Sequence, residues 1–166
     1  GGSPKVQGTK RGELVWAKLN PAFAGASFVK DKAKCASCHE DAMKPYAHTT
    51  HGRAFQHNPK GALQVQDCES CHGPRSGHLE NPDASLKMTA AQYTLACQQC
   101  HQGGNLMHWS NGRHATSDVN CTSCHSVMKK ESPKALLLKR TEADTCYTCH
   151  TQTRGEMQRS SHHPVR

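Results

Sequence analysis

Residues 68–72 of the chain read Cys68-Glu-Ser-Cys-His72, two cysteines separated by two residues with a histidine directly after the second. The pattern occurs five times and uses all ten cysteines of the chain. The motifs consist of Cys35, Cys38 and His39; Cys68, Cys71 and His72; Cys97, Cys100 and His101; Cys121, Cys124 and His125; and Cys146, Cys149 and His150. A histidine after every pair would arise by chance in about three of a million chains of this composition. The histidine is therefore part of the motif.

A Cys-x-x-Cys-His unit has the geometry that covalent attachment of c-type haem requires. On one helical turn the two thiols reach the two vinyl carbons, and the next imidazole is directed at the iron. Disulfide bonds would not need a histidine after each pair, and zinc sites built from such pairs need them in twos. The sequence therefore predicts five haem c groups, each attached through its two motif cysteines and ligated by its motif histidine.

The composition agrees with a fold organised by cofactors. Only 34% of the 166 residues are hydrophobic and 5% are aromatic, where a globular domain is nearer half apolar. Five haems leave about 33 residues for each, too few to wrap every porphyrin separately, so we expect the haems to lie against one another and form the core. No apolar run approaches the roughly 18 residues of a membrane-spanning helix.

Local signals predict short helices that lead into the motifs. Thr89-Ala-Ala-Gln92 and Thr141-Glu-Ala-Asp144 are capping boxes, or close to one, ahead of the third and fifth motifs. Gly73-Pro74 and Gly103-Gly104 should stop helices after the second and third motifs. No run alternates at period two for long enough to predict a sheet. The predicted fold class is mostly irregular with short α-helices and little or no β-structure, a multihaem cytochrome organised around a haem chain.

The position of the first motif divides the chain into two predicted parts. Residues 1–34 form an N-terminal extension expected to pack on the first haem, and residues 35–166 form a pentahaem cytochrome domain. Attachment of c-type haem takes place outside the bacterial cytoplasm, and the chain begins Gly-Gly-Ser without a signal peptide, as in a mature or trimmed protein. The predicted location is the periplasm.

The formal net charge of +8 does not indicate nucleic-acid binding. Two propionates on each of five haems contribute about −10 and five ferric centres about +5, which leaves about +3 oxidised and about −2 reduced. With three Phe, three Tyr and two Trp, the chain offers no stacking platform for bases. We interpret the excess of basic residues as compensation for the negative charge of the haem propionates.

Histidines outside the motifs suffice to supply a second axial ligand for every iron. Eight are present: His48, His51, His57, His78, His108, His114, His162 and His163. Neutral imidazole is the strongest nitrogen ligand available for haem iron, and bis-histidine coordination fills both axial positions. The sequence therefore predicts five six-coordinate haems.

Four further stretches carry a resemblance to a known family: 51–55 (His-Gly-Arg-Ala-Phe), 68–78, 108–114 and 161–165 (Ser-His-His-Pro-Val). Together with the motif order, they resemble the MtrA-type and DmsE-type periplasmic multihaem cytochromes, whose decahaem chains consist of two pentahaem halves similar to NrfB. The resemblance covers residues 35–166. The decahaem proteins continue into a sixth motif where this chain ends, so we expect an N-terminal half or a free-standing pentahaem relative.

The resemblance implies distal ligands at His51, His78 and His114, with His163 as a fourth. His163 lies next to Pro164, and His162 competes with it for this role.

The fifth distal ligand is where the chain departs from the family pattern. Relatives often have a histidine three residues after the fourth motif, where this chain has Met128. His108, His48, His57 or Met128 must then fill that role. We favour His108, because it lies beside Trp109 in a segment that we already expect to contact haem. We interpret Met128 as a packing residue.

The residues favour electron transfer over catalysis. Multihaem reductases keep one iron open to substrate, sometimes marked by lysine in place of the motif histidine, whereas all five motifs here end in histidine. No paired carboxylates or nucleophile constellation stands out, so we predict no catalytic residues. The alternative is a multihaem reductase with one open haem iron, and a haem-based sensor or a filament subunit is favoured less.

The resemblance also implies redox partners. Electrons would enter from a quinol-oxidising membrane cytochrome or a small periplasmic carrier, and outer-membrane porin-cytochrome components of an extracellular-respiration conduit would receive them. A half-length chain could not cross the outer membrane alone, which favours a periplasmic relay.

Overall fold

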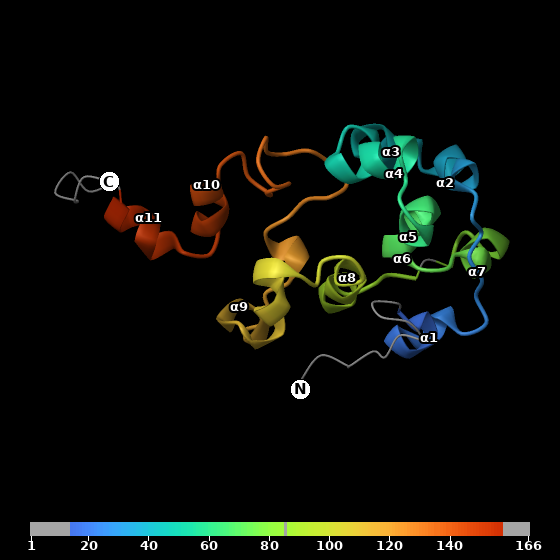
Figure 1. Ribbon diagram of the computed structural model, residues 1–166, viewed down its shortest axis with the longest axis horizontal. Coiled ribbons are helices and arrows are strands. Elements are labelled where there is room, and N and C mark those ends of the chain that lie inside the picture. Colours follow the sequence, from blue (N-terminus) through green and yellow to red (C-terminus); the bar gives the residue numbers. More distant parts are fainter. Residues whose placement is uncertain (1–13, 85, 158–166) are drawn as a thin grey trace.

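The computed structural model describes residues 14–84 and 86–157 as short helices joined by irregular segments (Figure 1). Within these residues there is no β-strand, and the β-type pairing is an isolated bridge between His125 and Leu137. The predicted fold class is confirmed. In the same residues, no helix is long and apolar enough to cross a membrane.

Helices are short throughout the first half of the chain. The elements are α1 (Trp16–Leu19), η1 (Pro21–Phe23), α2 (Lys32–Cys38), α3 (Glu40–Ala47), α4 (Thr50–His57), α5 (Ala62–Gln66), α6 (Cys68–His72) and α7 (Ser76–Glu80). Even α3 and α4 have only eight residues, and isolated helices of this length are unstable in water. Their stability must come from packing or from a cofactor.

The second half continues in the same manner. Its elements are α8 (Ala90–Cys97), η2 (Gly104–Asn111), α9 (Arg113–Thr116), η3 (Cys121–Ser123), α10 (Glu142–Tyr147) and α11 (Thr151–Met157). The helices that carry motif cysteines follow one another along the long axis of the molecule, from α2 through α6 and α8 to α10 (Figure 1). The order of the motifs in the sequence is thus also their order in space.

Both predicted helix starts are confirmed. The Thr89 side chain accepts a 3.2 Å hydrogen bond from the backbone N–H of Gln92, whose side chain accepts one of 3.0 Å from the N–H of Thr89. The Thr141 hydroxyl accepts from the N–H of Asp144 at 3.1 Å. These bonds satisfy N–H groups that the first helical turn leaves free.

The two glycine signals have different outcomes. Gly73 ends α6 with φ of +82°, and a Cβ there would lie 2.6 Å from the Phe23 ring, so both conformation and space require glycine. The expectation for Gly103-Gly104 is wrong, because α8 already ends at Cys97. Tight i→i+3 bonds across residues 96–100 end the helix early, and Gly104 begins η2.

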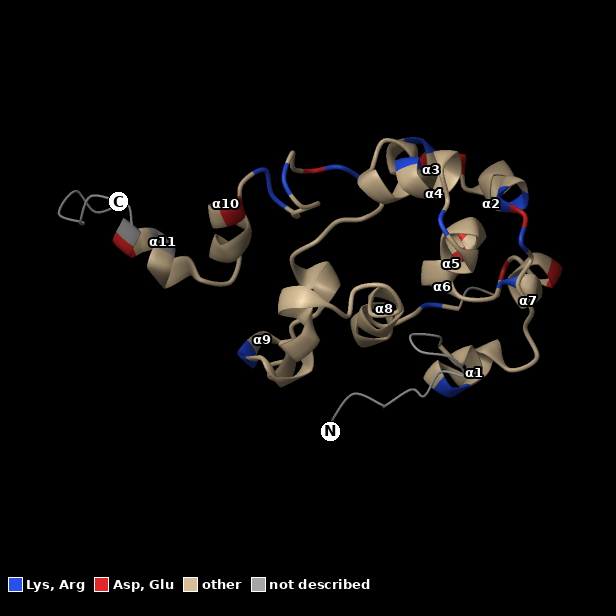
Figure 2. Cartoon of the chain, in the orientation of Figure 1, with Lys and Arg blue, Asp and Glu red and all other residues tan. Residues whose placement is uncertain are grey.

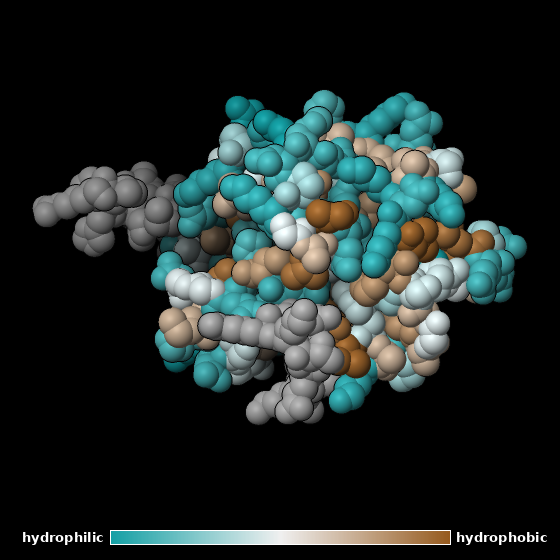
Figure 3. Space-filling model, turned by 45° about the vertical axis from the view of Figure 1, so that its right-hand side comes forward, coloured by the Kyte–Doolittle hydropathy of each residue, from teal (hydrophilic) through white to brown (hydrophobic). Residues whose placement is uncertain are grey.

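A small apolar core lies beside the third motif rather than at the centre of a globular domain. It consists of Trp16, Leu19, Phe23, Met88 and Ala96, with the Trp16 and Phe23 rings edge to face at 5.5 Å. On the face drawn in Figure 3, hydrophobic residues form small groups within a mostly hydrophilic surface. Residues 16–23 thus pack against α8 and the residues before it, while the contact of the N-terminal extension with the first haem stays a prediction.

Candidate haem-binding sites

The backbone presents each cysteine pair and its histidine on one helical turn. In four motifs the histidine N–H donates to the carbonyl of the first cysteine, at 3.0 Å for His39 and His101 and 2.9 Å for His125 and His150. The second motif forms the whole of α6. All ten thiols are free, so none is consumed by a disulfide bond. This is the local geometry that a c-type haem needs.

Glu69 anchors the second motif to the residues that precede the first. Its buried carboxylate accepts hydrogen bonds from the backbone N–H groups of Val29 at 2.9 Å, Lys30 at 2.8 Å and Arg75 at 3.1 Å. Burial raises the pKa of the Cys35 and Cys68 thiols, and each thiol also influences the pKa of the other. The first and second attachment sites are therefore neighbours.

The third motif contacts the second through a direct hydrogen bond. Gln99 Nε2, between the two cysteines of the third motif, donates to the carbonyl of Ser70 in the second motif at 2.7 Å. Burial raises the pKa of Cys71 to about 11, and the nearby Cys100 thiol adds to the rise. Once bonded to haem, these sulfur atoms no longer titrate. Their interaction here indicates only that the second and third motifs lie close together.

The fourth motif lies against α8, which carries the third. Asn120 Oδ1 accepts from the Thr94 hydroxyl at 2.9 Å, and the Thr94 oxygen accepts from the N–H of Cys121 at 3.2 Å. The Cys97 and Cys121 thiols also interact, and this interaction raises the pKa of Cys97 and lowers that of Cys121. The third and fourth attachment sites are neighbours as well.

The fifth motif follows the fourth through the segment between them. The N–H of Leu138 donates to the carbonyl of Cys124 at 2.9 Å, and that of Lys139 donates to the Thr145 hydroxyl at 3.3 Å. Burial raises the pKa of Cys124, and electrostatic interactions with Cys146 and Cys149 raise it further. The five motifs thus form one continuous series.

Three motif histidines face a histidine from outside the motifs. Ring centroids are 6.2 Å apart for His39 and His78, 6.0 Å for His51 and His101, and 6.3 Å for His114 and His150.

This spacing can be compared with that of two imidazoles on one metal ion. With metal–nitrogen bonds of about 2 Å and ring radii of about 1.1 Å, two imidazoles on opposite sides of an iron atom have centroids about 6 Å apart. The three pairs fit axial ligation of haem iron.

The surroundings of the rings that face the motif histidines also suit ligation of iron. The Nδ1 atoms of His51 and His78 are buried without a hydrogen-bond partner among the described residues, which is unusual for a buried polar atom in a finished site. Burial lowers the pKa of His51, and His101 lowers it further. Both effects favour the neutral imidazole that binds iron.

The other two motif histidines are held by a hydrogen bond instead. His72 Nδ1 lies 3.1 Å from the Tyr93 hydroxyl, and His125 Nδ1 lies 2.8 Å from the carbonyl of Ala135. No described ring outside the motifs faces either imidazole at the spacing of the three pairs.

Among the described residues, the remaining candidate histidines form no such ring pair with a motif histidine. His48, His57 and His108 are exposed, with His108 on η2, and Met128 is half-buried. His162 and His163 lie outside the described residues.

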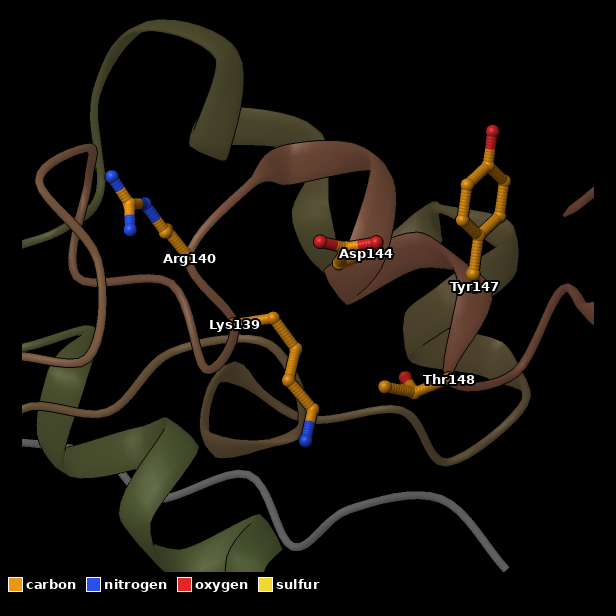
Figure 4. Close-up of a pocket in the computed structure, with 5 residues that line it drawn as sticks. All are labelled: Lys139, Arg140, Asp144, Tyr147 and Thr148. Carbon is orange, nitrogen blue, oxygen red and sulfur yellow. The ribbon is translucent and has the colours of Figure 1, made fainter.

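A hollow of about 310 Å³ adjoins the fifth motif (Figure 4). It is lined by Lys139 and Arg140 before α10, by Asp144 and Tyr147 on that helix, and by Thr148 at its end. Basic residues are frequent along the segment that leads into α10 (Figure 2). Positive charge beside an attachment site suits the carboxylates of haem propionates.

Comparison with known proteins agrees with these sites. The family model described as "Doubled CXXCH motif" matches residues 114–155, which include the fourth and fifth motifs. The chain is also 32% identical over 165 residues to "Multiheme cytochrome MtrA" of Shewanella baltica (strain OS185), an alignment that covers 93% of this chain. The chain is an MtrA-like multihaem c-type cytochrome. It accordingly binds haem c covalently through Cys-x-x-Cys-His motifs.

The MtrA-like chain spans about half the length of this relative, 48% of which the alignment covers. No solved structure matches the chain. The pairing of individual histidines in this MtrA-like cytochrome therefore rests on its own geometry.

Proposed function

We propose that this chain carries electrons along five covalently bound haems, one at each Cys-x-x-Cys-His motif. The observation that supports this most is the series of hydrogen bonds between successive motifs, from those of Glu69 with Val29 and Lys30 to that of Leu138 with Cys124. A haem c accepts or gives one electron at its iron. Groups attached at adjacent positions form a path in which every step is short, with the first and fifth motifs at its ends.

The three histidine pairs support an assignment of the iron ligands. His39 with His78, His51 with His101 and His114 with His150 would supply both axial ligands of the first, third and fifth irons. Each pair joins segments far apart in the sequence, so ligation also holds the short helices together. We propose His163 and His108 as distal ligands of the other two irons, with His162, His48, His57 and Met128 as alternatives.

Two neutral imidazoles suit electron transfer better than catalysis. They bind ferric and ferrous low-spin iron with little change in geometry, and a fully ligated iron has no open position for a substrate. We therefore infer an electron carrier without catalytic residues.

The similarity to MtrA supports a periplasmic location and a place in or near an extracellular-respiration conduit. The partners we propose are a quinol-oxidising membrane cytochrome and periplasmic carriers on one side, and outer-membrane porin-cytochrome components on the other. The chain would act as a relay between them.

Two measurements on the mature protein test this proposal. Intact mass should show five haems per chain, and a reductive titration should consume five electrons per chain. Fewer haems at full maturation would mean that one motif is structural. Rapid, stoichiometric binding of carbon monoxide or cyanide at any haem would instead favour the alternative, a reductase with an open iron.

A further inference from the structure

The second motif differs from its neighbours in how its histidine is held. The His72 Nδ1 atom lies 3.1 Å from the Tyr93 hydroxyl, and the two rings are edge to face with centroids 5.6 Å apart. Tyr93 is half-buried on α8, the helix that ends at the first cysteine of the third motif. One helix thus carries an attachment site for one haem and a hydrogen-bond partner for the ligand of another.

We propose that Tyr93 is a positioning residue for His72, and that it sets the reduction potential of the haem at the second motif. This inference rests on the proposed function. When His72 Nε2 binds iron, Nδ1 carries the proton and donates to the Tyr93 oxygen. An acceptor on Nδ1 makes the imidazole a stronger electron donor, which stabilises ferric over ferrous iron and lowers the potential.

The surroundings hold this hydrogen bond in place. Tyr93 packs against the apolar core of Trp16, Leu19, Phe23, Met88 and Ala96. Helix α8 is fixed at its start by the Thr89 capping box and by a 3.1 Å hydrogen bond from Gln92 Nε2 to the carbonyl of Leu19. The oxygen that faces His72 therefore has little freedom to move away.

A neighbouring arginine links the second motif to the residues before α8. Arg75 is held by hydrogen bonds to the carbonyls of His72 at 2.9 Å and Leu86 at 3.1 Å.

A comparison within the chain shows what Tyr93 adds. His125 in the fourth motif has the backbone carbonyl of Ala135 as its Nδ1 partner, which no side-chain substitution removes. Among the described side chains, Tyr93 alone is hydrogen-bonded to a motif imidazole. Position 93 is therefore a place where a single substitution can change the electronic properties of one haem without replacing an iron ligand.

The test is a spectroelectrochemical titration of the mature protein with Tyr93→Phe, which removes the hydroxyl and keeps the ring. The reduction potential of one of the five steps should rise by about 59 mV. For one electron this is a tenfold change in the equilibrium constant of that step. Incorporation of 3-fluorotyrosine at position 93, which weakens the oxygen as an acceptor, should move the same step less in the same direction. The second variant keeps the core fully packed.

A matched control is Thr94→Val, which removes the neighbouring hydroxyl on α8, bonded to Asn120 and Cys121 rather than to an imidazole. It should leave the step that Tyr93→Phe moves at its wild-type position. If either Tyr93 variant titrates like wild type while the wild type takes up five electrons, Tyr93 has no such role and the relay function stands. If the wild type fails to take up five electrons reversibly, the relay function itself is wrong.

Discussion

The Tyr46 hydroxyl donates a 2.5 Å hydrogen bond to Oδ1 of Asp67, and both side chains are buried. Asp67 lies between α5 and α6, immediately before Cys68, with a positive φ of 55°. The hydrogen bond therefore ties α3 to the start of the second haem-attachment motif. Asp67 Oδ2 has no partner among the described residues. The hydrogen bond from the Tyr46 hydroxyl therefore offsets most of the free-energy cost of burying this carboxyl group.

We expect Tyr46→Phe to lower the free energy of unfolding of the mature cytochrome by about 2 kcal/mol, because it leaves a buried carboxyl group without a donor. Denaturant titration followed by far-UV circular dichroism measures this. Tyr46→Phe with Asp67→Asn should cost less than the sum of the single changes, since both remove the same interaction. Additive costs would show that the two side chains are not coupled.

The same pair predicts a loss of stability at alkaline pH. Burial raises the pKa of Tyr46 above its usual value of 10.0, and the hydrogen bond to Asp67 raises it further. The unfolded chain then loses this proton at lower pH than the folded chain does. The contribution of Tyr46 to the free energy of unfolding is complete below pH 10 and is lost progressively as the pH rises above 10. Unfolding free energies measured from pH 8 to 11 should fall more steeply for wild type than for Tyr46→Phe, and parallel curves would contradict this.

Glu69 predicts a second stability effect. Glu69→Gln should lower the free energy of unfolding by about 2 kcal/mol, because an amide cannot accept from the N–H groups of Val29, Lys30 and Arg75 with both of its terminal atoms. Glu80→Gln, on the exposed end of α7, is the matched control and should change little. Equal effects of the two substitutions would mean that the backbone contacts of Glu69 contribute nothing special.

These contacts show what could be predicted from the sequence. Thr89, Thr141 and Gly73 act on residues within one helical turn, so their roles are visible in the local sequence. Glu69 occupies a variable position within its motif, and its partners Val29 and Lys30 are about 40 residues away in the sequence. Nothing in the local pattern distinguishes it from another surface glutamate.

The roles of the histidines could also be predicted only in part from the sequence. The motif spacing indicates which imidazoles belong to the attachment sites, and the family resemblance implies distal roles for His51, His78 and His114. Which motif each of them faces is a long-range property: His51, between the first two motifs, faces His101 in the third. Tyr93 could be found only from the structure, because a lone tyrosine on a helix is more often a core residue than a partner of a ligand.

The histidine pairs lead to a prediction for the first iron. His78→Met should replace bis-histidine ligation by His39 and a methionine, which raises one reduction step and gives a sulfur-to-iron charge-transfer band in the oxidised near-infrared spectrum. Val65→Met, which places a methionine at an exposed position, should give neither change. If His78→Met retains the wild-type spectrum and potentials, His78 is not a ligand.

The last prediction concerns the fifth distal ligand, for which we favour His108. His108→Met should convert one haem of five to mixed ligation and raise one reduction step, while Met128→Leu should leave the visible spectrum unchanged. Wild type should show no sulfur-to-iron charge-transfer band, because such a band would assign Met128 as a ligand. His108 is exposed on η2, so its imidazole is not held by packing in the described structure. If His108→Met changes nothing while His48→Met or His57→Met does, the ligand lies between the first two motifs and the assignment to His108 is wrong.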